Sequence, residues 1–514
     1  QAYPGPGLEV AGATQTQQLT EEFLATVNGG LFAQHQLGWR NWVFTTLGVR
    51  YDYASAFGAQ APGVWYPKAS ISVVAVSLKK WRPRLGVSSL RLRAALGESG
   101  RQPGAFDKFT TFAPLQAQTG IGLVPLNLGN QRLQPEISRE AELGFELGLL
   151  NDRVSLGATY WDRQVRDALV AVQFPPSGGF LQQQLANVGR LAGRGAELKL
   201  DVVAVNRPDL QLNVYANGAY LWQRITTLGA APIKIPAGGA RYRQFLREGF
   251  APGALFGAVR ARPCSERPAG ATFTCLQPGQ LPYDLDRDGA PDTEAQMLAF
   301  LAQPRTTAAL PILRVDQDGN GDFLDHYLGK PIPDWSGSFG TQMTFRRSWN
   351  LVTLFEYRTG FTMTNLTMAF RNSNPGNGQN SLAFNEVERA LVNPASTPQE
   401  RLAAVNRWSD LVALSPQDGL NQNEPGDFLR FRELGLAYTL PTRVLRPTRA
   451  SSAQLQFAVR NLALWTRYSG TDPETNAIAR GGSTDQSVNN FVESLDAFGL
   501  PLPRRYALSV RLTF

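Results

Sequence analysis

Two acidic turns carry the residues of this sequence that are best suited to binding a metal ion. In each turn, oxygen-bearing side chains stand at alternate positions, and a glycine, Gly289 or Gly321, stands sixth. Calcium takes six to eight oxygen ligands, and a glycine at the sixth position lets the chain turn sharply around the ion. The candidate ligands are Asp284, Asp286, Asp288 and Asp292 in the first turn, and Asp316, Asp318, Asn320, Asp322 and Asp325 in the second.

The twelfth position of both turns departs from the EF-hand pattern. Ala295 and Tyr327 stand there, where an EF-hand has a bidentate glutamate. A turn rich in Asp, Asn and Gly that needs no metal explains the same residues, because these side chains accept hydrogen bonds from nearby backbone amides. We therefore expect no required cofactor, and a structural Ca²⁺ ion and a metal-free turn both stay open.

Cys264 and Cys275 lie in a stretch rich in proline and glycine. A disulfide formed in an oxidising compartment and two free thiols are both compatible with this placement. Zinc is disfavoured, because two cysteines alone make no site and the histidines, His35 and His326, are far apart in the sequence. The sequence has no HExxH, Gly-x-Ser-x-Gly or Walker motif, and we expect a protein that is not an enzyme.

The strands that must position these turns show their sequence pattern most clearly at the end of the chain, from Arg504 to Phe514. Arg505 and Arg511 fall on one face of an extended strand there. The residues on the other face are Tyr506, Leu508, Val510, Leu512 and Phe514. A terminal strand that ends on an aromatic residue is typical of the closing strand of an outer-membrane barrel, although a half-buried strand of a soluble protein alternates in the same way.

The same alternation recurs upstream and predicts about thirteen strands. From Glu140 to Leu150, for example, Glu140, Glu142 and Glu146 share a face that is tolerable only in contact with water. Charged residues make up only 18% of the chain, and 49 glycines and 34 prolines indicate many turns. No apolar run of about 18 residues marks a transmembrane helix.

Short and long connections alternate between these strands, as periplasmic turns and extracellular loops do in outer-membrane barrels. We predict one long extracellular loop over residues 224–333, which holds the acidic turns, and another over residues 359–427. In the second loop, Thr397-Pro398-Gln399-Glu400 forms a capping box that opens a short helix. Within Phe428 to Leu440, Arg430 and Arg432 fall at the same alternate positions as Leu434, Leu436 and Tyr438. A β-bulge, or a strand that rises above the lipid, would explain this break in the alternation.

The predicted fold is all-β: a partial antiparallel up-and-down transmembrane β-barrel of about thirteen strands, with long extracellular loops and short periplasmic turns. A closed antiparallel barrel needs an even number of strands. We therefore expect the outer edge of the last strand to be unpaired and further strands to precede Gln1, so that the sequence is a processed chain or a fragment.

The formal net charge of +8 raises the question of nucleic acid. The basic residues are scattered, with no block longer than pieces such as Lys79-Lys80-Trp81-Arg82. A nucleic-acid surface needs such residues clustered on one face, so we expect no nucleic-acid partner.

Blocks spread over nearly the whole chain resemble, in order, the SusC/RagA family of TonB-dependent outer-membrane transporters. They include Arg50-Tyr51-Asp52, Tyr66-Pro67, Leu90-Arg91-Leu92-Arg93, Gly129-Asn130, Asn187-Val188-Gly189, Gly193-Arg194-Gly195-Ala196-Glu197, Asp316 to Asp325, Tyr468-Ser469-Gly470 and Asp472-Pro473-Glu474. The sequence departs from the family pattern in two places, because Gly193-Arg194-Gly195 stands where Asn-Lys-Gly is usual and Pro135 stands where tryptophan is frequent.

The resemblance implies that residues 1–514 form the carboxy-terminal part of a TonB-dependent receptor β-barrel in the bacterial outer membrane. It implies uptake of an oligosaccharide, peptide or similar nutrient, with a SusD-like surface lipoprotein and a TonB complex that acts through a plug region absent from this sequence. Outer-membrane lipid and the barrel-assembly machinery are further expected partners. The alternative is a passive or adhesive outer-membrane barrel that binds ligands through its long loops without TonB.

Overall fold

A computed structural model describes most of the chain. The described residues are 25–59, 63–75, 86–117, 120–173, 177, 180, 183–235, 243–267, 271–305, 310–316, 319–373, 382–412, 423–447, 450–476 and 494–514. No helix in these ranges is long and apolar enough to cross a membrane.

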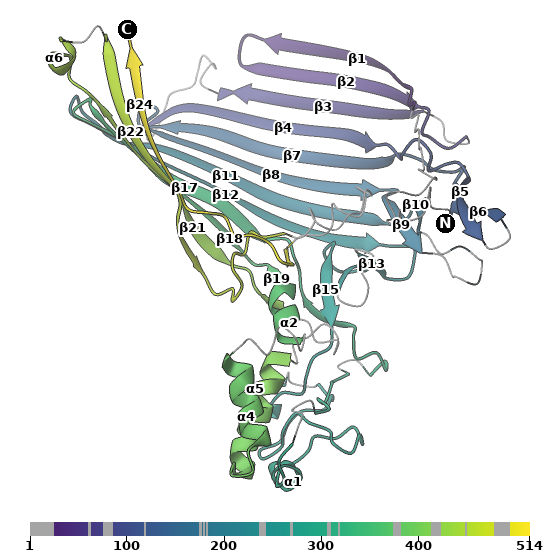
Figure 1. The fold of residues 1–514 in the computed structure, drawn as a ribbon. Coiled ribbons are helices and arrows are strands. Elements are labelled where there is room, and N and C mark those ends of the chain that lie inside the picture. Colours follow the sequence, from purple (N-terminus) through teal and green to yellow (C-terminus); the bar gives the residue numbers. More distant parts are fainter. Residues whose placement is uncertain are drawn as a thin grey trace, which may run out of the picture.

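Thirteen antiparallel strands form one large curved sheet in chain order (Figure 1). They are β1 (Asn28–Trp39), β2 (Val43–Ala54), β3 (Val64–Val74), β4 (Val87–Arg101), β7 (Glu136–Leu149), β8 (Val154–Arg166), β11 (Arg190–Asn206), β12 (Leu210–Thr227), β17 (Trp335–Phe345), β18 (Trp349–Thr359), β21 (Phe428–Thr439), β22 (Ser452–Thr466) and β24 (Arg505–Thr513). The predicted fold class and strand number are confirmed.

The sheet is open, with β1 and β24 at its two edges. Among the described residues, β24 pairs with β22 alone, from Arg505 opposite Arg460 to Thr513 opposite Ser452. The unpaired outer edge predicted for the last strand is therefore confirmed.

The two faces of the sheet differ in polarity, because successive side chains of a strand point to opposite sides. On the apolar face, Leu143, Leu198 and Tyr160 are exposed, and so are the closing-strand residues Tyr506, Leu508, Val510, Leu512 and Phe514, by 52 to 80%. On the polar face, Arg93 of β4, Glu142 of β7 and Arg163 of β8 stand on neighbouring strands. Exposed apolar surface on this scale marks contact with a membrane or a partner.

Exposed tryptophans lie at both ends of the strands. Trp39 and Trp349 lie next to short turns, whereas Trp335 and Trp465 lie next to long connections. Aromatic side chains at both limits of an apolar face are typical of the two interfaces between membrane and water.

The short turns lie at one end of the sheet and the long connections at the other, as predicted. The turns between β1 and β2, β7 and β8, and β17 and β18 contain residues of positive φ, among them Asn41, Asn151 and Arg347. Such residues form tight turns whose twist matches that of the flanking strands.

The predicted bulge is confirmed at Arg432. Leu354 of β18 pairs with Glu433 and the next residue, Phe355, pairs with Phe431, so Arg432 is the additional residue. The register with β22 also shifts at this point, but there β22 has the additional residue, since Glu433 pairs with Arg460 and Phe431 with Ala463. The bulge restores the alternation that the sequence pattern loses at this point.

The predicted limits of the long loops are partly wrong. Strand β12 continues to Thr227, so the first long connection begins at Leu228 rather than at residue 224. Arg224 and Thr226 are polar because the strand rises beyond the apolar band, where alternation no longer marks it. The first connection contains β13 (Ile233–Ile235), β14 (Gln244–Leu246), β15 (Ala254–Gly257), α1 (Glu294–Phe300) and β16 (His326–Gly329), and β13 to β16 form a small sheet.

The second long connection holds more structure than the one short helix predicted. The expected helix is α5 (Pro398–Val412), and the capping box is present: Glu400 N donates to Thr397 Oγ1 at 3.2 Å, and Thr397 N donates to Glu400 Oε2 at 2.7 Å. The connection also holds β19 (Thr362–Asn365), α2 (Leu366–Ser373), α4 (Leu382–Val392) and β20 (Asn423–Pro425). The remaining elements are β5 (Thr111–Ala117), β6 (Gly120–Asn127), β9 (Leu169–Gln173), β10 (Gln183–Asn187), η4 (Cys264–Glu266), α6 (Thr442–Leu445) and β23 (Leu495–Asp496).

The two longest connections pack on each other and share a core. Tyr283 and Met297 of the first are buried together with Val387 and Val405 of the second. Arg401, only 2% exposed, joins them through hydrogen bonds to backbone carbonyls on both sides, those of Leu301, Ala302, Asn393 and Pro394. In Figure 1 the resulting helical subdomain, with α1, α4 and α5, projects away from the sheet.

Candidate functional site

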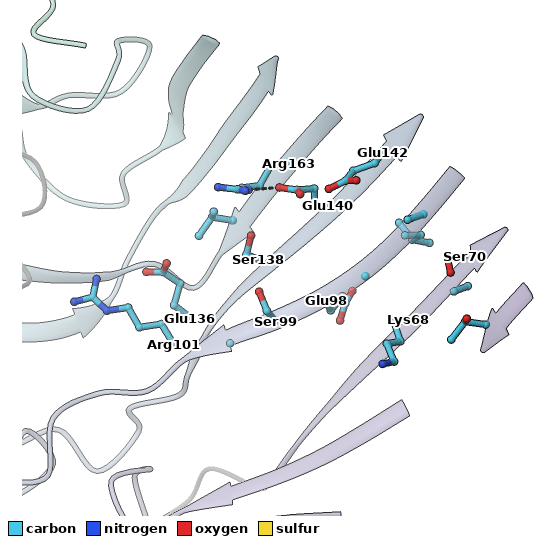
Figure 2. Close-up of a pocket in the computed structure, with 17 residues that line it drawn as sticks. Lys68, Ser70, Glu98, Ser99, Arg101, Glu136, Ser138, Glu140, Glu142 and Arg163 are labelled. Atoms are coloured by element: carbon cyan, nitrogen blue, oxygen red, sulfur yellow. Dashed lines mark hydrogen bonds and ion pairs between the residues drawn. The ribbon is translucent and has the colours of Figure 1, made fainter. Parts of the chain in front are cut away.

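A groove of about 700 Å³ lies along the sheet over strands β2, β3, β4, β7 and β8 (Figure 2). Strand alternation brings Glu136, Ser138, Glu140 and Glu142 of β7 to one face. Lys68 and Ser70 of β3 and Arg101 of β4 line the same groove.

Charge in the groove is mixed and only partly paired. Arg163 Nε of β8 lies 2.5 Å from Glu140 Oε2, and Glu142 stands beside Glu140 (Figure 2). Further along the polar face, Arg91 pairs with Glu146 at 3.7 Å, and Arg93 donates to the Thr159 hydroxyl at 2.5 Å. This wall presents both carboxylates and cations to water, and it has the chemistry to hold a polar ligand by several weak contacts.

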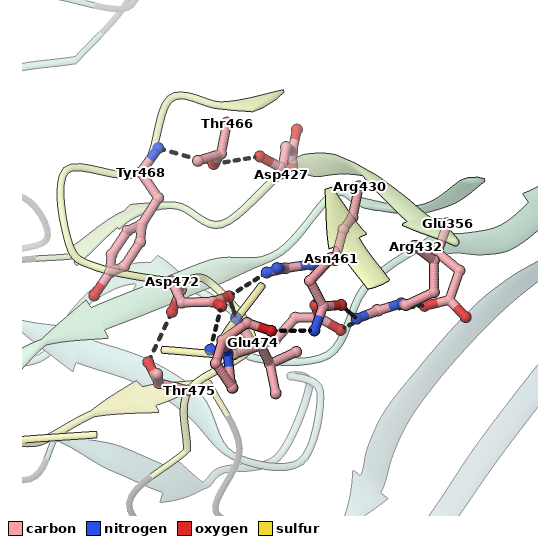
Figure 3. Close-up of polar contacts among 12 residues, drawn as sticks. Glu356, Asp427, Arg430, Arg432, Asn461, Thr466, Tyr468, Asp472, Glu474 and Thr475 are labelled. Atoms are coloured by element: carbon pink, nitrogen blue, oxygen red, sulfur yellow. Dashed lines mark hydrogen bonds and ion pairs between the residues drawn. The ribbon is translucent and has the colours of Figure 1, made fainter. Parts of the chain in front are cut away.

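A second polar group is buried where β21 meets the segment that follows β22 (Figure 3). Arg430 is 3% exposed; its Nη2 lies 2.5 Å from Asp472 Oδ1 and its Nε lies 2.5 Å from Glu474 Oε2. Arg432, turned by the bulge, pairs with Glu356 of β18 and with Glu474 at 2.7 Å. Its Nη1 also donates to Asn461 Oδ1 at 3.1 Å. This ionic cluster fastens residues 472–474 to the end of the sheet.

A buried tyrosine extends the attachment. The Tyr468 hydroxyl donates to Asp496 Oδ2 at 2.8 Å, and the Thr367 hydroxyl donates to Asp496 Oδ1 at 2.6 Å. Burial, together with the neighbouring Asp496 carboxylate, raises the pKa of Tyr468 far above its usual value. The phenol is thus neutral and donates within the connection between β22 and β24, and the Thr367 hydroxyl joins the same carboxylate to the connection that follows β18.

Residues 3–462 match the family described as TonB dependent receptor-like, beta-barrel. The chain belongs to this family of TonB-dependent receptors. The resemblance predicted from the sequence is therefore confirmed, and the family is one of outer-membrane receptors.

Two curated relatives come from Formosa agariphila. TonB-dependent receptor P26 is 23% identical over 512 residues, which cover 96% of this chain and 47% of that protein. TonB-dependent receptor P3 is 21% identical over 492 residues, which cover 91% and 44%. The chain spans about half the length of these relatives.

Among solved structures, the fold is similar to that of the RagAB peptide transporter. The TM-score is 0.68 at 21% identity, over 95% of this chain and 48% of that chain. The RagAB peptide importer in its 'open-open' state gives the same TM-score at 19% identity, over 98% and 48%. The match establishes the architecture of the receptor sheet.

The first acidic turn of the receptor brings three of its predicted ligands together. Carboxylate oxygens of Asp284, Asp286 and Asp288 lie within 4.8 Å of one another. Asp284 also accepts hydrogen bonds from the amides of Asp288 and Gly289, at 3.0 and 3.2 Å. Asp292 is buried and accepts from Leu285 N at 2.7 Å; burial and the nearby carboxylates raise its pKa.

The second acidic turn is organised by hydrogen bonds. Asp316 accepts from the amides of Gly319 and Gly321 at 2.8 and 2.7 Å, and Asn320 donates to Asp325 Oδ2 at 2.8 Å. Asp322 accepts from Leu324 N at 2.8 Å. Asp318 lies outside the described residues. These bonds suit a metal-free turn, and calcium binding stays a prediction for both turns.

The two cysteines form a disulfide, with Cα atoms 4.9 Å apart, beside an isolated β-bridge between Pro263 and Leu276. Of the two states left open by the sequence, the receptor has the bonded one.

Sequence reasoning missed the ionic cluster and the groove. From the sequence, Asp472 and Glu474 were recognised only as part of a family motif, and Arg430 only as a residue that breaks the alternation of its strand. The one available signal was that Arg430 and Arg432 break the alternation of the strand. A charged side chain on the apolar side of such a pattern needs either water or an oppositely charged partner. The groove depends on which strands become neighbours, as with Lys68 and Glu142, which no local pattern reveals.

Proposed function

We propose that this receptor is a TonB-dependent outer-membrane nutrient transporter whose polar face lines the path of the ligand. The observation that carries the proposal is the division of one sheet into an apolar face with aromatic ends and a charged face with a groove. The first suits lipid, and the second suits a water-filled lumen.

The ligand we propose is an oligosaccharide, a peptide or a similar polar nutrient. Carboxylates such as Glu142, beside cations such as Lys68 and Arg163, offer hydrogen bonds of both senses to such a molecule. The similar fold of the RagAB peptide transporter supports a peptide among these choices.

We further propose a surface lipoprotein partner that docks over the long connections, and energy supplied by a TonB complex. The helical subdomain projects on the long-connection side of the sheet, where such a partner would approach (Figure 1). A transporter of this kind is not an enzyme, and the proposal assigns no reaction to the groove.

The test is growth of cells that carry the full-length receptor as their route for a defined oligopeptide mixture or a defined oligosaccharide mixture. We expect growth on one mixture, and its loss when TonB is deleted or when a protonophore collapses the inner-membrane gradient. The matched control is growth on a monosaccharide that enters through general porins. Uptake that survives both treatments would instead support the passive or adhesive barrel.

The lipoprotein is tested separately by purifying the tagged receptor in mild detergent and identifying co-purifying proteins by mass spectrometry. A stoichiometric lipoprotein that is lost when residues 382–412 are deleted supports the docking site. A receptor that purifies alone from cells growing on the nutrient contradicts it.

A further inference from the structure

A hollow of about 580 Å³ lies on the apolar face, over strands β4 to β18. Small side chains stand beside large ones in it: Ala196 pairs with Tyr160 and with Tyr220, and Ala158 pairs with Leu198. Leu143 and Trp335 complete its wall. The hollow is thus a depression in an otherwise bulky apolar wall.

The strand register shows what lies next to the hollow on the side of the long connections. The row that contains Tyr160, Ala196 and Tyr220 continues to Trp335. Two residues further along each strand, and so on the same face, the next row contains Asp162, Arg194 and Trp222. The row after that contains Arg139, Gln164, Ala192 and Arg224.

Two of these arginines stack on one tryptophan. The guanidinium carbon of Arg194 lies 4.6 Å from the centre of the Trp222 ring, and that of Arg224 lies 5.5 Å from it. Cation–π contact of this kind holds a guanidinium over a ring while leaving its N–H groups available. Both arginines are exposed, as is Arg139.

The charge of this group is largely uncompensated. Arg166, further out, pairs with Glu98 at 3.6 Å. Within the part of the chain that the structure describes, Arg139, Arg194 and Arg224 form no ion pair. The acidic residues in their two rows are Asp162 and Glu98 of β4, which stands opposite Arg139 in the register and is the partner of Arg166. Three cations on β7, β11 and β12 therefore stand against the Asp162 carboxylate, because the Glu98 carboxylate is paired with Arg166.

We propose that this surface binds a phosphate-bearing lipid of the outer leaflet, with its phosphate on Arg194, Arg224 and Arg139 and an acyl chain in the hollow. Along the strand direction, the surface presents the arginines first, then the aromatic row of Tyr160, Tyr220 and Trp335, and then the apolar hollow. A lipid has the matching order of phosphate headgroup followed by acyl chains. Guanidinium groups bind phosphate oxygens in a fixed, often bidentate geometry. Tyrosine and tryptophan side chains are typically found at the level of the lipid headgroups.

The inference rests on the outer-membrane location in the proposed function, and it is independent of ligand, TonB and lipoprotein. It is tested with the full-length receptor, stripped of lipid in detergent and titrated with bisphosphorylated lipid A. The wild type is compared with the Arg194→Gln/Arg224→Gln variant. The matched control is Arg346→Gln/Arg347→Gln, which removes two arginines at the opposite end of the sheet, where Arg346 also stacks on an aromatic ring, Phe345.

We expect the Arg194→Gln/Arg224→Gln variant to bind lipid A about tenfold more weakly or worse, since each lost charge-assisted hydrogen bond weakens binding by at least that order. Lipid A without phosphates should bind the wild type as weakly as the variant binds the intact lipid. The control should keep wild-type affinity. Excess inorganic phosphate should not displace the lipid, because it cannot occupy the hollow.

The hollow is tested by Ala196→Trp, which fills the depression and leaves the arginines in place. Weaker binding of lipid A, with an unchanged circular dichroism spectrum and melting temperature, supports the acyl-chain contact. Equal affinity for intact and dephosphorylated lipid, or wild-type affinity in Arg194→Gln/Arg224→Gln, overturns the proposal. Because the readout is lipid affinity, a failed nutrient-uptake test would leave this result standing, and the reverse also holds.

Discussion

Replacement of Arg430 by methionine tests the role of the ionic cluster at the end of the sheet. Methionine approximates the volume of the arginine stem but leaves Asp472, which is 2% exposed, without its cation. Removing one partner of a buried ion pair costs about 3–5 kcal/mol. The lower end of this range applies, because Asp472 still accepts hydrogen bonds from the amides of Glu474 and Leu502, at 2.9 and 3.1 Å.

A loss of about 3 kcal/mol corresponds to about a hundredfold shift in the equilibrium between the attached and detached states of residues 467–476. Hydrogen exchange followed by mass spectrometry measures this shift, since amides that exchange through detachment should then exchange about a hundredfold faster. The matched control is Arg460→Gln, which breaks the exposed pair with Glu433 at 3.3 Å. Exposed pairs contribute about 0–1 kcal/mol, so exchange in the control should rise less than about fivefold.

The double variant Arg430→Met/Asp472→Leu distinguishes the loss of the ion pair from a general destabilisation caused by the substitution. Because it leaves no unpaired buried charge, it should exchange more slowly than Arg430→Met alone. Wild-type exchange in Arg430→Met, or additive effects of the two substitutions, would refute the reasoning.

Three further outcomes are expected. Calorimetric titration of the receptor with CaCl₂ should lose its heat in an Asp284→Asn/Asp286→Asn variant if the first acidic turn binds calcium; identical heats in both proteins would remove that site. Hydrogen bonds from the backbone amide and hydroxyl of Thr397 hold the pKa of Glu400 below its usual value. The carboxylate therefore stabilises the start of α5 at neutral pH and ceases to do so as pH falls through that lowered pKa. Protection of the backbone amides at the start of α5 from hydrogen exchange should therefore fall in acid. Glu400→Gln should abolish this pH dependence. Arg401→Met leaves four backbone carbonyls without their donor and should make residues 294–305 sensitive to limited proteolysis, whereas Arg407→Met on the exposed side of α5 should not.

Much of the sheet was predictable because its signal is local. Alternation with a period of two marks a strand wherever one face meets an apolar medium and the other meets water. The prediction failed where that contrast ends, as at Arg224 and Thr226, which belong to β12 although both lie beyond the apolar band. It also failed for α4, whose residues Val387 and Leu391 are held by packing against another connection.

The capping box at Thr397 shows how far local chemistry reaches. Its bonds join residues three positions apart, and the structure has them as predicted. The calcium pattern is equally local, but a metal-free turn uses the same side chains for its own amides, so the pattern alone does not decide between the two.

The sequence by itself determined the strands, their number, the alternation of short and long connections and the family, because each of these follows from the order of residues along the chain. Only the tertiary structure decided that Arg430 meets Asp472, 42 positions away, and that Lys68 shares a groove with Glu142. It likewise placed Arg194 and Arg224 on one tryptophan beside an apolar hollow. Such contacts depend on the register between strands. The register is set by the pairing of all the residues of two strands together, so it cannot be inferred from the residue at any single position.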